Sequence, residues 1–116
     1  MDAMLTPEAV ERLLATLNAA RPVASRKMFG GVGLYCDGAF FGVIDDDLLY
    51  LKSDAETDPT YDGEDAAPWV LPQGPMPYRQ IVPAILADSE KLGERIDMAV
   101  EIWRRKNAKK KPRQGK

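Results

Sequence analysis

The sequence contains no histidine, which is the commonest general base and metal ligand in proteins. That absence excludes Ser-His-Asp and Cys-His catalysis. The single cysteine, Cys36, cannot form an intrachain disulfide, and its place among apolar residues predicts an inert thiol rather than a reactive one. Because no nucleophile is paired with a base elsewhere, the residues favour a protein that is not an enzyme and that takes no cofactor or metal.

Long apolar runs are also missing. No stretch approaches the ~20 apolar residues of a membrane span, and the first residues lack the basic cluster of a signal peptide. A composition of 45% hydrophobic and 29% charged residues over 116 positions is typical of one soluble domain. We therefore expect a cytoplasmic protein that does not bind membranes.

The charges are divided unevenly, although the net charge is only −2. No acid follows Glu101, and half of the sixteen basic residues lie beyond Trp103. This division predicts a domain over residues 1–106 and a flexible basic tail over 107–116. A solvated tail is favoured over one that binds nucleic acid, since no aromatic residue follows Trp103 to stack on bases. The cations that could contact phosphates are Arg104, Arg105, Lys109, Lys110, Lys111 and Arg113.

The chain is organised around the pair Asp37-Gly38, which lies between two runs of alternating apolar residues. Asp-Gly is a strong hairpin signal, because a two-residue type I′ turn needs positive φ at both central positions. A third strand is expected over 48–52, after a turn at 45–47. Side chains alternate along a strand, so one face of this unit is apolar and must be covered. That face is expected to carry Val32, Leu34, Cys36, Ala39, Phe41, Val43, Leu49 and Leu51.

The opposite face of the hairpin offers the most interesting surface. In the register set by the turn, Gly33 faces Gly42 and leaves bare backbone between the pair Tyr35 and Phe40 and the side chain of Ile44. Close packing of another element is one explanation of the two glycines. The alternative is a shallow interaction groove for a peptide or a second subunit, formed by these five residues.

The remaining segments complete an α+β pattern. Two amphipathic helices are predicted at the ends of the chain, with short strands between them and a polar middle segment. A two-layer domain follows, in which an antiparallel sheet of about five strands, a three-strand block plus a two-strand block, carries both helices on one face. The predicted helices cover 7–20 and 88–106, a short irregular helix falls within 54–68, and further strands cover 24–29, 68–71 and 76–81.

Two motifs invite a chemical assignment that the residues do not support. The acids Asp45, Asp46 and Asp47 lack the spaced oxygen ligands of a calcium loop, so we interpret them as a solvated turn. The run of glycines at 30, 31 and 33 leads into a strand and not into a helix, which argues against a phosphate-binding loop.

A family resemblance rests on residues between positions 26 and 52. The motif positions are Arg26, Met28, Phe29, Gly30, Gly31, Gly33, Tyr35, Gly42, Tyr50 and Lys52. They closely resemble the TfoX N-terminal domain family, found at the front of the regulators of bacterial natural competence. The resemblance implies a small bacterial protein with an antiparallel sheet and flanking helices. It implies no catalytic residues, and the motif positions are interpreted first as structural.

The leading hypothesis is a non-enzymatic protein-interaction domain with a regulatory role, as the resemblance implies, linked to transcription or competence and able to pair with itself as a homodimer. The alternative is an accessory nucleic-acid-binding protein that acts through its basic tail. A small-molecule site or a carboxylate-based enzyme is a third, less favoured, interpretation.

Overall fold

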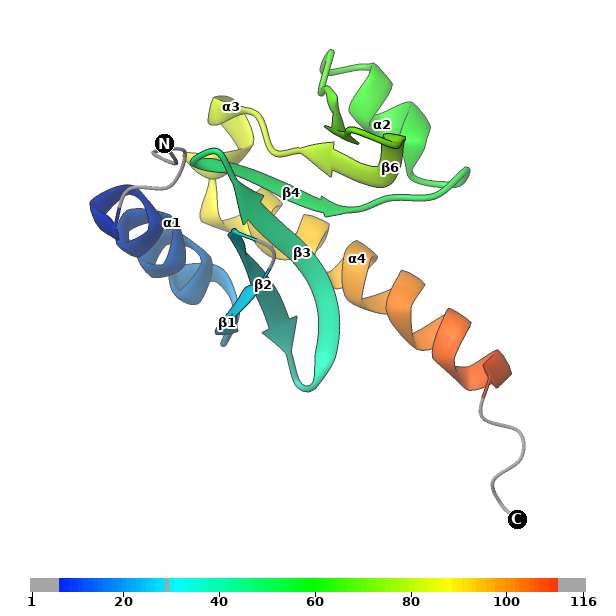
Figure 1. Cartoon of the computed structure of the whole chain (residues 1–116), viewed down its shortest axis with the longest axis horizontal. Helices are drawn as coiled ribbons and strands as arrows, with labels where there is room; N and C mark the ends of the chain where they lie inside the picture. Colours follow the sequence, from blue (N-terminus) through cyan, green and yellow to red (C-terminus); the bar gives the residue numbers. More distant parts are fainter. Residues whose placement is uncertain (1–6, 29, 111–116) are drawn as a thin grey trace.

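The computed structural model describes residues 7–28 and 30–110. Helices and strands follow one another as in the pattern predicted from the sequence (Figure 1). The helices are α1 (Pro7–Ala20), α2 (Asp58–Asp62), α3 (Pro83–Leu86) and α4 (Ser89–Lys110). The strands are β1 (Ala24–Met28), β2 (Gly31–Cys36), β3 (Ala39–Asp45), β4 (Leu48–Lys52), β5 (Pro68–Leu71) and β6 (Gly74–Gln80).

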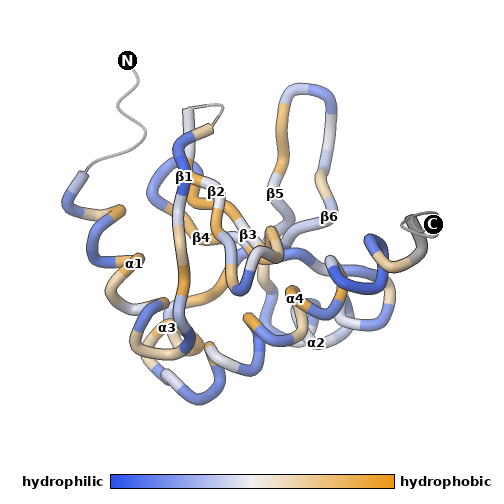
Figure 2. Tube along the Cα trace, turned by 90° about the horizontal axis from the view of Figure 1, so that it is seen from below, coloured by the Kyte–Doolittle hydropathy of each residue, from blue (hydrophilic) through white to orange (hydrophobic). Residues whose placement is uncertain are grey.

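All six strands join one antiparallel sheet in the order β1-β2-β3-β4-β6-β5. The helices gather on one side of it, which we call the inner face, and leave the other side, the outer face, without a helix from the described residues (Figure 2). The predicted two-layer α+β fold is confirmed. The sheet has six strands rather than about five, because Ala24–Met28 pairs with β2 along its whole length.

Two tight turns set the geometry of the central strands. Asp37 and Gly38 have φ of 55° and 80°, so the predicted turn with two positive φ angles is confirmed. Asp46 and Asp47, with φ of 55° and 60°, form a second such turn between β3 and β4. Aspartate tolerates this left-handed region better than most residues, which explains why acids can occupy it.

A β-bulge changes the hairpin register beyond the first two residue pairs. Leu34 faces Gly42 instead of Phe41, and Gly33 faces Val43, so the predicted Gly33–Gly42 pair is wrong. β3 holds one more residue than β2 at this point, and both Phe41 and Gly42 turn toward the inner face. Alternation of apolar residues does not reveal such an insertion.

The bulge also exchanges two side chains between the faces. Ile44 pairs with Val32 and Leu49 and is fully buried in the core, whereas it was expected on the outer face. Val43 was expected in the core but pairs with Gly33 and Tyr50 on the outer face.

The core lies between the inner face and the two long helices. Leu34 and Phe41 are both fully buried in it, as the hairpin argument requires. Leu17 of α1 and Ile96 of α4 are buried in the same cluster, which joins the two layers. Cys36 packs at the margin of this cluster, and burial raises the pKa of its thiol, which lowers its thiolate fraction.

Helix α4 begins at the predicted cap. The Lys91 amide donates to the Asp88 carboxylate at 3.1 Å, and the helix runs to Lys110, so the predicted end at about 106 is four residues short. No proline or glycine lies between Lys106 and Pro112 to end the helix earlier. Within the described residues, no helix is both long and apolar enough to cross a bilayer.

The hairpin formed by β5 and β6 projects from the outer side of the sheet (Figure 2). Pro75 pairs only with β5, since β4 begins to pair with β6 at Tyr78. The prediction that the prolines hold both strands at an edge is therefore correct for β5 and for the first half of β6, whereas the second half of β6 lies between two strands.

Candidate functional site

The outer face is hollowed between Met28 of β1 and Trp69 and Leu71 of β5, where a cleft opens beside Val43. β1 and β2 lie on one side of β3 and β4 in the sheet, and the projecting β5–β6 hairpin lies on the other (Figure 2). We call this surface the trough. Its floor carries Phe40, Val43, Asp45, Tyr50 and Lys52, and its walls carry Arg26, Met28, Gly33 and Tyr35 on one side and Trp69, Leu71 and Tyr78 on the other.

Five aromatic rings form a continuous chain across the trough. Tyr35 lies 5.3 Å from Phe40, measured between ring centroids, and Phe40 lies 6.4 Å from Tyr78. Trp69 connects Tyr78, at 5.2 Å, to Tyr50, at 6.2 Å. Such edge-to-face and offset contacts rigidify a surface, since each ring is oriented by its neighbours.

A lysine lies within this aromatic chain. The Lys52 ammonium is 4.8 Å from the ring centroid of Tyr78 and 5.4 Å from that of Phe40, and it donates a 2.9 Å hydrogen bond to the Tyr78 hydroxyl. Burial lowers the pKa of Lys52, with a smaller contribution from the positive charge of Lys106. Among the described residues, no carboxylate forms a salt bridge with Lys52. Arg26 similarly lies 6.0 Å from the Tyr35 ring.

The other end of the trough holds a small apolar cleft of about 80 Å³. Met28 and Gly31 bound it on one wall, Trp69 and Leu71 on the other, and Val43 on the floor. An engineered cavity that binds benzene measures about 150 Å³, so this cleft is suited to one aliphatic side chain and not to a cofactor.

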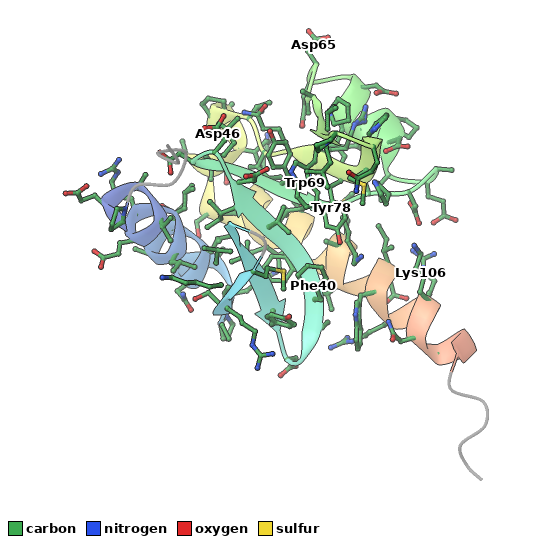
Figure 3. The ribbon with its side chains drawn as sticks, viewed as in Figure 1. Phe40, Asp46, Asp65, Trp69, Tyr78 and Lys106 are labelled. Atoms are coloured by element: carbon green, nitrogen blue, oxygen red, sulfur yellow. The ribbon has the colours of Figure 1, made fainter. Side chains whose placement is uncertain are left out.

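Charge is distributed unequally along the trough. Asp45 and Asp46 lie at the end with the cleft. Burial of Tyr50 raises the pKa of its hydroxyl, and the negative charges of these two acids raise it further. Lys52 and Lys106 lie at the opposite end. Figure 3 shows this arrangement, with Asp46 and Lys106 at the two extremes and Phe40, Tyr78 and Trp69 between them.

The groove expected from the sequence is only partly present. Gly33, Tyr35 and Phe40 do lie together on the outer face, and Met28 covers the Gly33 backbone. The bulge turns Gly42 and the Ile44 side chain to the inner face, although Ile44 is also among the residues that line the cleft. The predicted strip of bare glycine backbone is therefore wrong. The hollow of the outer face lies between the two walls instead.

Most motif positions lie on the trough. Tyr50 and Lys52 are on its floor, Gly31 lines the cleft and Gly30 adopts a positive φ of 77° in the turn above it. Phe29 lies outside the described residues. The motif members on the trough are Arg26, Met28, Gly31, Gly33, Tyr35, Tyr50 and Lys52.

The cations proposed for nucleic-acid contact are partly engaged within the domain. Arg104 lies 3.8 Å from Asp37, and Arg105 pairs with Asp54, Glu56 and Glu101 at 3.3 to 3.8 Å. Of the other four, the side chains of Lys109 and Lys110 and the whole of Lys111 and Arg113 lie outside the described residues.

Several residues of the trough were not assigned to a site in the sequence prediction. Among them, Trp69, Leu71 and Tyr78 come from the β5–β6 hairpin, and Asp45 was assigned to a solvated turn. The Asp45 carboxylate instead accepts a 2.8 Å hydrogen bond from the Trp69 indole. The signal available was the aromatic content of two proline-rich strands, since tyrosine and tryptophan require a partner for their polar tips when buried.

Comparison with known families places the chain in one of them. A model of the TfoX N-terminal domain matches residues 15–102, which is most of the chain. The chain belongs to the TfoX N-terminal domain family. The matched span of this TfoX N-terminal domain runs from the second half of α1 into the second half of α4, so it contains the whole sheet and every trough residue. A search of curated proteins finds no match to the chain.

Proposed function

We infer that this TfoX N-terminal domain is a non-enzymatic, cytoplasmic protein-interaction module with a regulatory role, and that the trough is its interaction surface. One observation carries the inference. The outer face is free of the described helices, yet it bears five aromatic rings and two cations, Arg26 and Lys52, held against those rings. Aromatic residues and arginine are enriched where proteins bind one another.

The position of Lys52 favours a role in binding over a role in stability alone. A half-buried ammonium without a carboxylate partner is a cost to the isolated domain, since burial disfavours its charged form. The cation is explained if a partner completes the site.

The test is affinity capture from the native lysate with variants that preserve the fold. Lys52→Met keeps the aliphatic stem and removes the charge, and Leu71→Ser removes an apolar wall. The matched controls are Lys91→Met, an exposed lysine on α4, and Val70→Ser, whose side chain is exposed and points away from the cleft. Loss of the same partner with both trough variants, and with neither control, supports the function. Capture that is equal for all four proteins rejects it.

The nucleic-acid alternative receives less support from the structure. Two of its six cations form ion pairs with acids of the domain, and the trough has Asp45 and Asp46 at one end. An electrophoretic shift assay over a salt series, comparing the full chain with residues 1–110, measures what the last six residues contribute. Strong, salt-sensitive binding by the full chain alone would favour this alternative.

A further inference from the structure

We propose that the trough binds a single extended peptide segment of a partner protein, with an aliphatic side chain in the apolar cleft and a carboxylate on Lys52. This inference rests on the proposed interaction function and specifies the chemistry of the partner. It follows from the shape of the trough, the size of the cleft and the charges at the two ends.

The shape favours a segment over a second sheet. The β5–β6 hairpin projects from the outer side of the sheet (Figure 2), and the cleft between it and Met28 has a volume of about 80 Å³. That volume admits one side chain, whereas a second sheet laid face to face would present several side chains at once. A single extended segment can place one side chain in the cleft while the rest of it lies over the aromatic surface.

The cleft selects the apolar residue of the segment. Its volume of about 80 Å³ and its lining of Met28, Val43, Trp69 and Leu71 suit one leucine, isoleucine or methionine side chain. Met28 can adjust to the shape of the guest, because an unbranched thioether side chain repacks easily.

Lys52 selects the acidic residue. Its ammonium has three donors, of which one is used on the Tyr78 hydroxyl, and no described carboxylate lies within salt-bridge distance. A partner carboxylate would form a charge-assisted hydrogen bond in a half-buried, aromatic setting, where such a bond is stronger than on an open surface. Lys106 adds positive charge at the same end.

The register of β4 sets the distance between the two anchors. Val43 pairs with Tyr50, and Lys52 lies two residues farther along β4, whereas Asp45 pairs with Leu48, four residues from Lys52. At a rise of about 3.4 Å per residue, the cleft and the ammonium are separated by roughly 7 to 14 Å along the strand. An extended segment therefore needs its aliphatic and acidic residues two to four positions apart.

Nucleic acid fits the trough less well. The rings of Phe40 and Tyr78 face the Lys52 ammonium and each other, so they are not open for base stacking. Asp45 and Asp46 would repel phosphates at the end with the cleft.

The experiment is a selection of random twelve-residue peptides displayed on phage against the full-length chain. The best enriched peptide is then labelled with fluorescein, and its affinity is measured by polarisation together with a version in which its acid is replaced by the amide. We expect enriched peptides to share an aliphatic residue two to four positions from an acid. Lys52→Met should weaken the acidic peptide at least about tenfold and leave the amide version unchanged. Leu71→Ser should weaken both versions, whereas Lys91→Met and Val70→Ser should weaken neither.

Several results would overturn the proposal. They are the absence of enriched peptides, enrichment without an acid, an acidic peptide indifferent to Lys52→Met, or self-association of the chain that depends on Lys52. If peptides fail while capture from lysate still depends on Lys52 and Leu71, the interaction function stands and only the peptide mode is rejected. If capture is also independent of both residues, the proposed function falls as well.

Discussion

The indole of Trp69 donates a 2.8 Å hydrogen bond to the carboxylate of Asp45, and this contact ties the β5–β6 hairpin to the floor of the trough. The two residues are 24 positions apart in the sequence. Trp69 also packs against Tyr50 and Tyr78, so the hydrogen bond orients the ring that connects Tyr50 to the rest of the aromatic chain.

Replacing Asp45 should therefore loosen the hairpin. Asp45→Asn exchanges a charge-assisted hydrogen bond for a neutral one, and we expect a loss of about 1 kcal/mol of unfolding free energy. Asp46→Asn removes the same charge from the next residue, which is exposed, and asparagine tolerates its positive φ. Urea unfolding followed by tryptophan fluorescence measures both. Equal effects of the two variants would contradict a structural role of the Trp69 contact.

Three glycines should differ in their tolerance of a Cβ atom. A Cβ at Gly42 would lie 2.6 Å from both the Leu51 side chain and the Tyr50 carbonyl oxygen, so Gly42→Ala should cost about 3 kcal/mol or more. A Cβ at Gly33 would meet the flexible end of Met28 at 2.8 Å, which can move, and about 1 kcal/mol is expected. Gly63→Ala meets only ordinary contacts and should be neutral or stabilise by up to about 1 kcal/mol. Thermal melts rank the three, and a Gly42 variant that is no less stable than the Gly33 variant contradicts the bulged register.

Alkaline pH should destabilise the domain through two tyrosines. Burial raises the pKa of Tyr61 and of Tyr78 to about 12, against a value near 10 in the unfolded chain. Stability present below pH 10 is lost as the pH rises toward 12, because only the unfolded state then releases these protons. Each tyrosine accounts for about 2 to 3 kcal/mol of this loss. Tyr61→Phe and Tyr78→Phe should each flatten the decline, measured as unfolding free energy between pH 9 and 12. Variants that lose stability in parallel with the wild type would refute this.

Acid pH should act through a different pair. Arg95, buried in α4, donates to both oxygens of the Glu64 carboxylate, and this bonding lowers the pKa of Glu64. The pair stabilises the fold above the unfolded value of 4.5, and its contribution is lost as the pH falls through the lower folded value. Glu64→Gln should cost about 2 kcal/mol at pH 7, because it leaves a buried guanidinium without its countercharge, and should weaken the acid dependence. Glu94→Gln is the control, because Glu94 lies on the exposed side of α4, the helix that carries Arg95. A Glu64 variant that matches it would be evidence against the pair.

The architecture was predictable because its signals are local. Asp37-Gly38 determines a turn by backbone conformation alone, and the spacing of Leu92 and Ile96 places one side of α4 in the core. The bulge beside Leu34 was not predictable, since one extra residue in an apolar strand leaves the local pattern nearly unchanged. Its effect was to move Gly42 to the inner face, and the predicted groove lost its glycine floor.

Only part of the site was predictable from the sequence, for a related reason. Tyr35 and Phe40 are neighbours across a hairpin, so their contact follows from the turn. Trp69 and Tyr78 reach the same surface from strands far along the chain, and only the tertiary fold brings them to Lys52. Local propensity carries no information about such long-range contacts.

The central claim is that the outer face of the sheet, and not the helical side, contacts another protein. Photo-cross-linking in cells tests it most directly, with Phe40 replaced by p-benzoylphenylalanine in one strain and exposed Glu94 of α4 replaced in another. We expect a discrete cross-linked adduct from position 40 that weakens with Lys52→Met, and none from position 94. An adduct from position 94 alone, or from neither position, would contradict it.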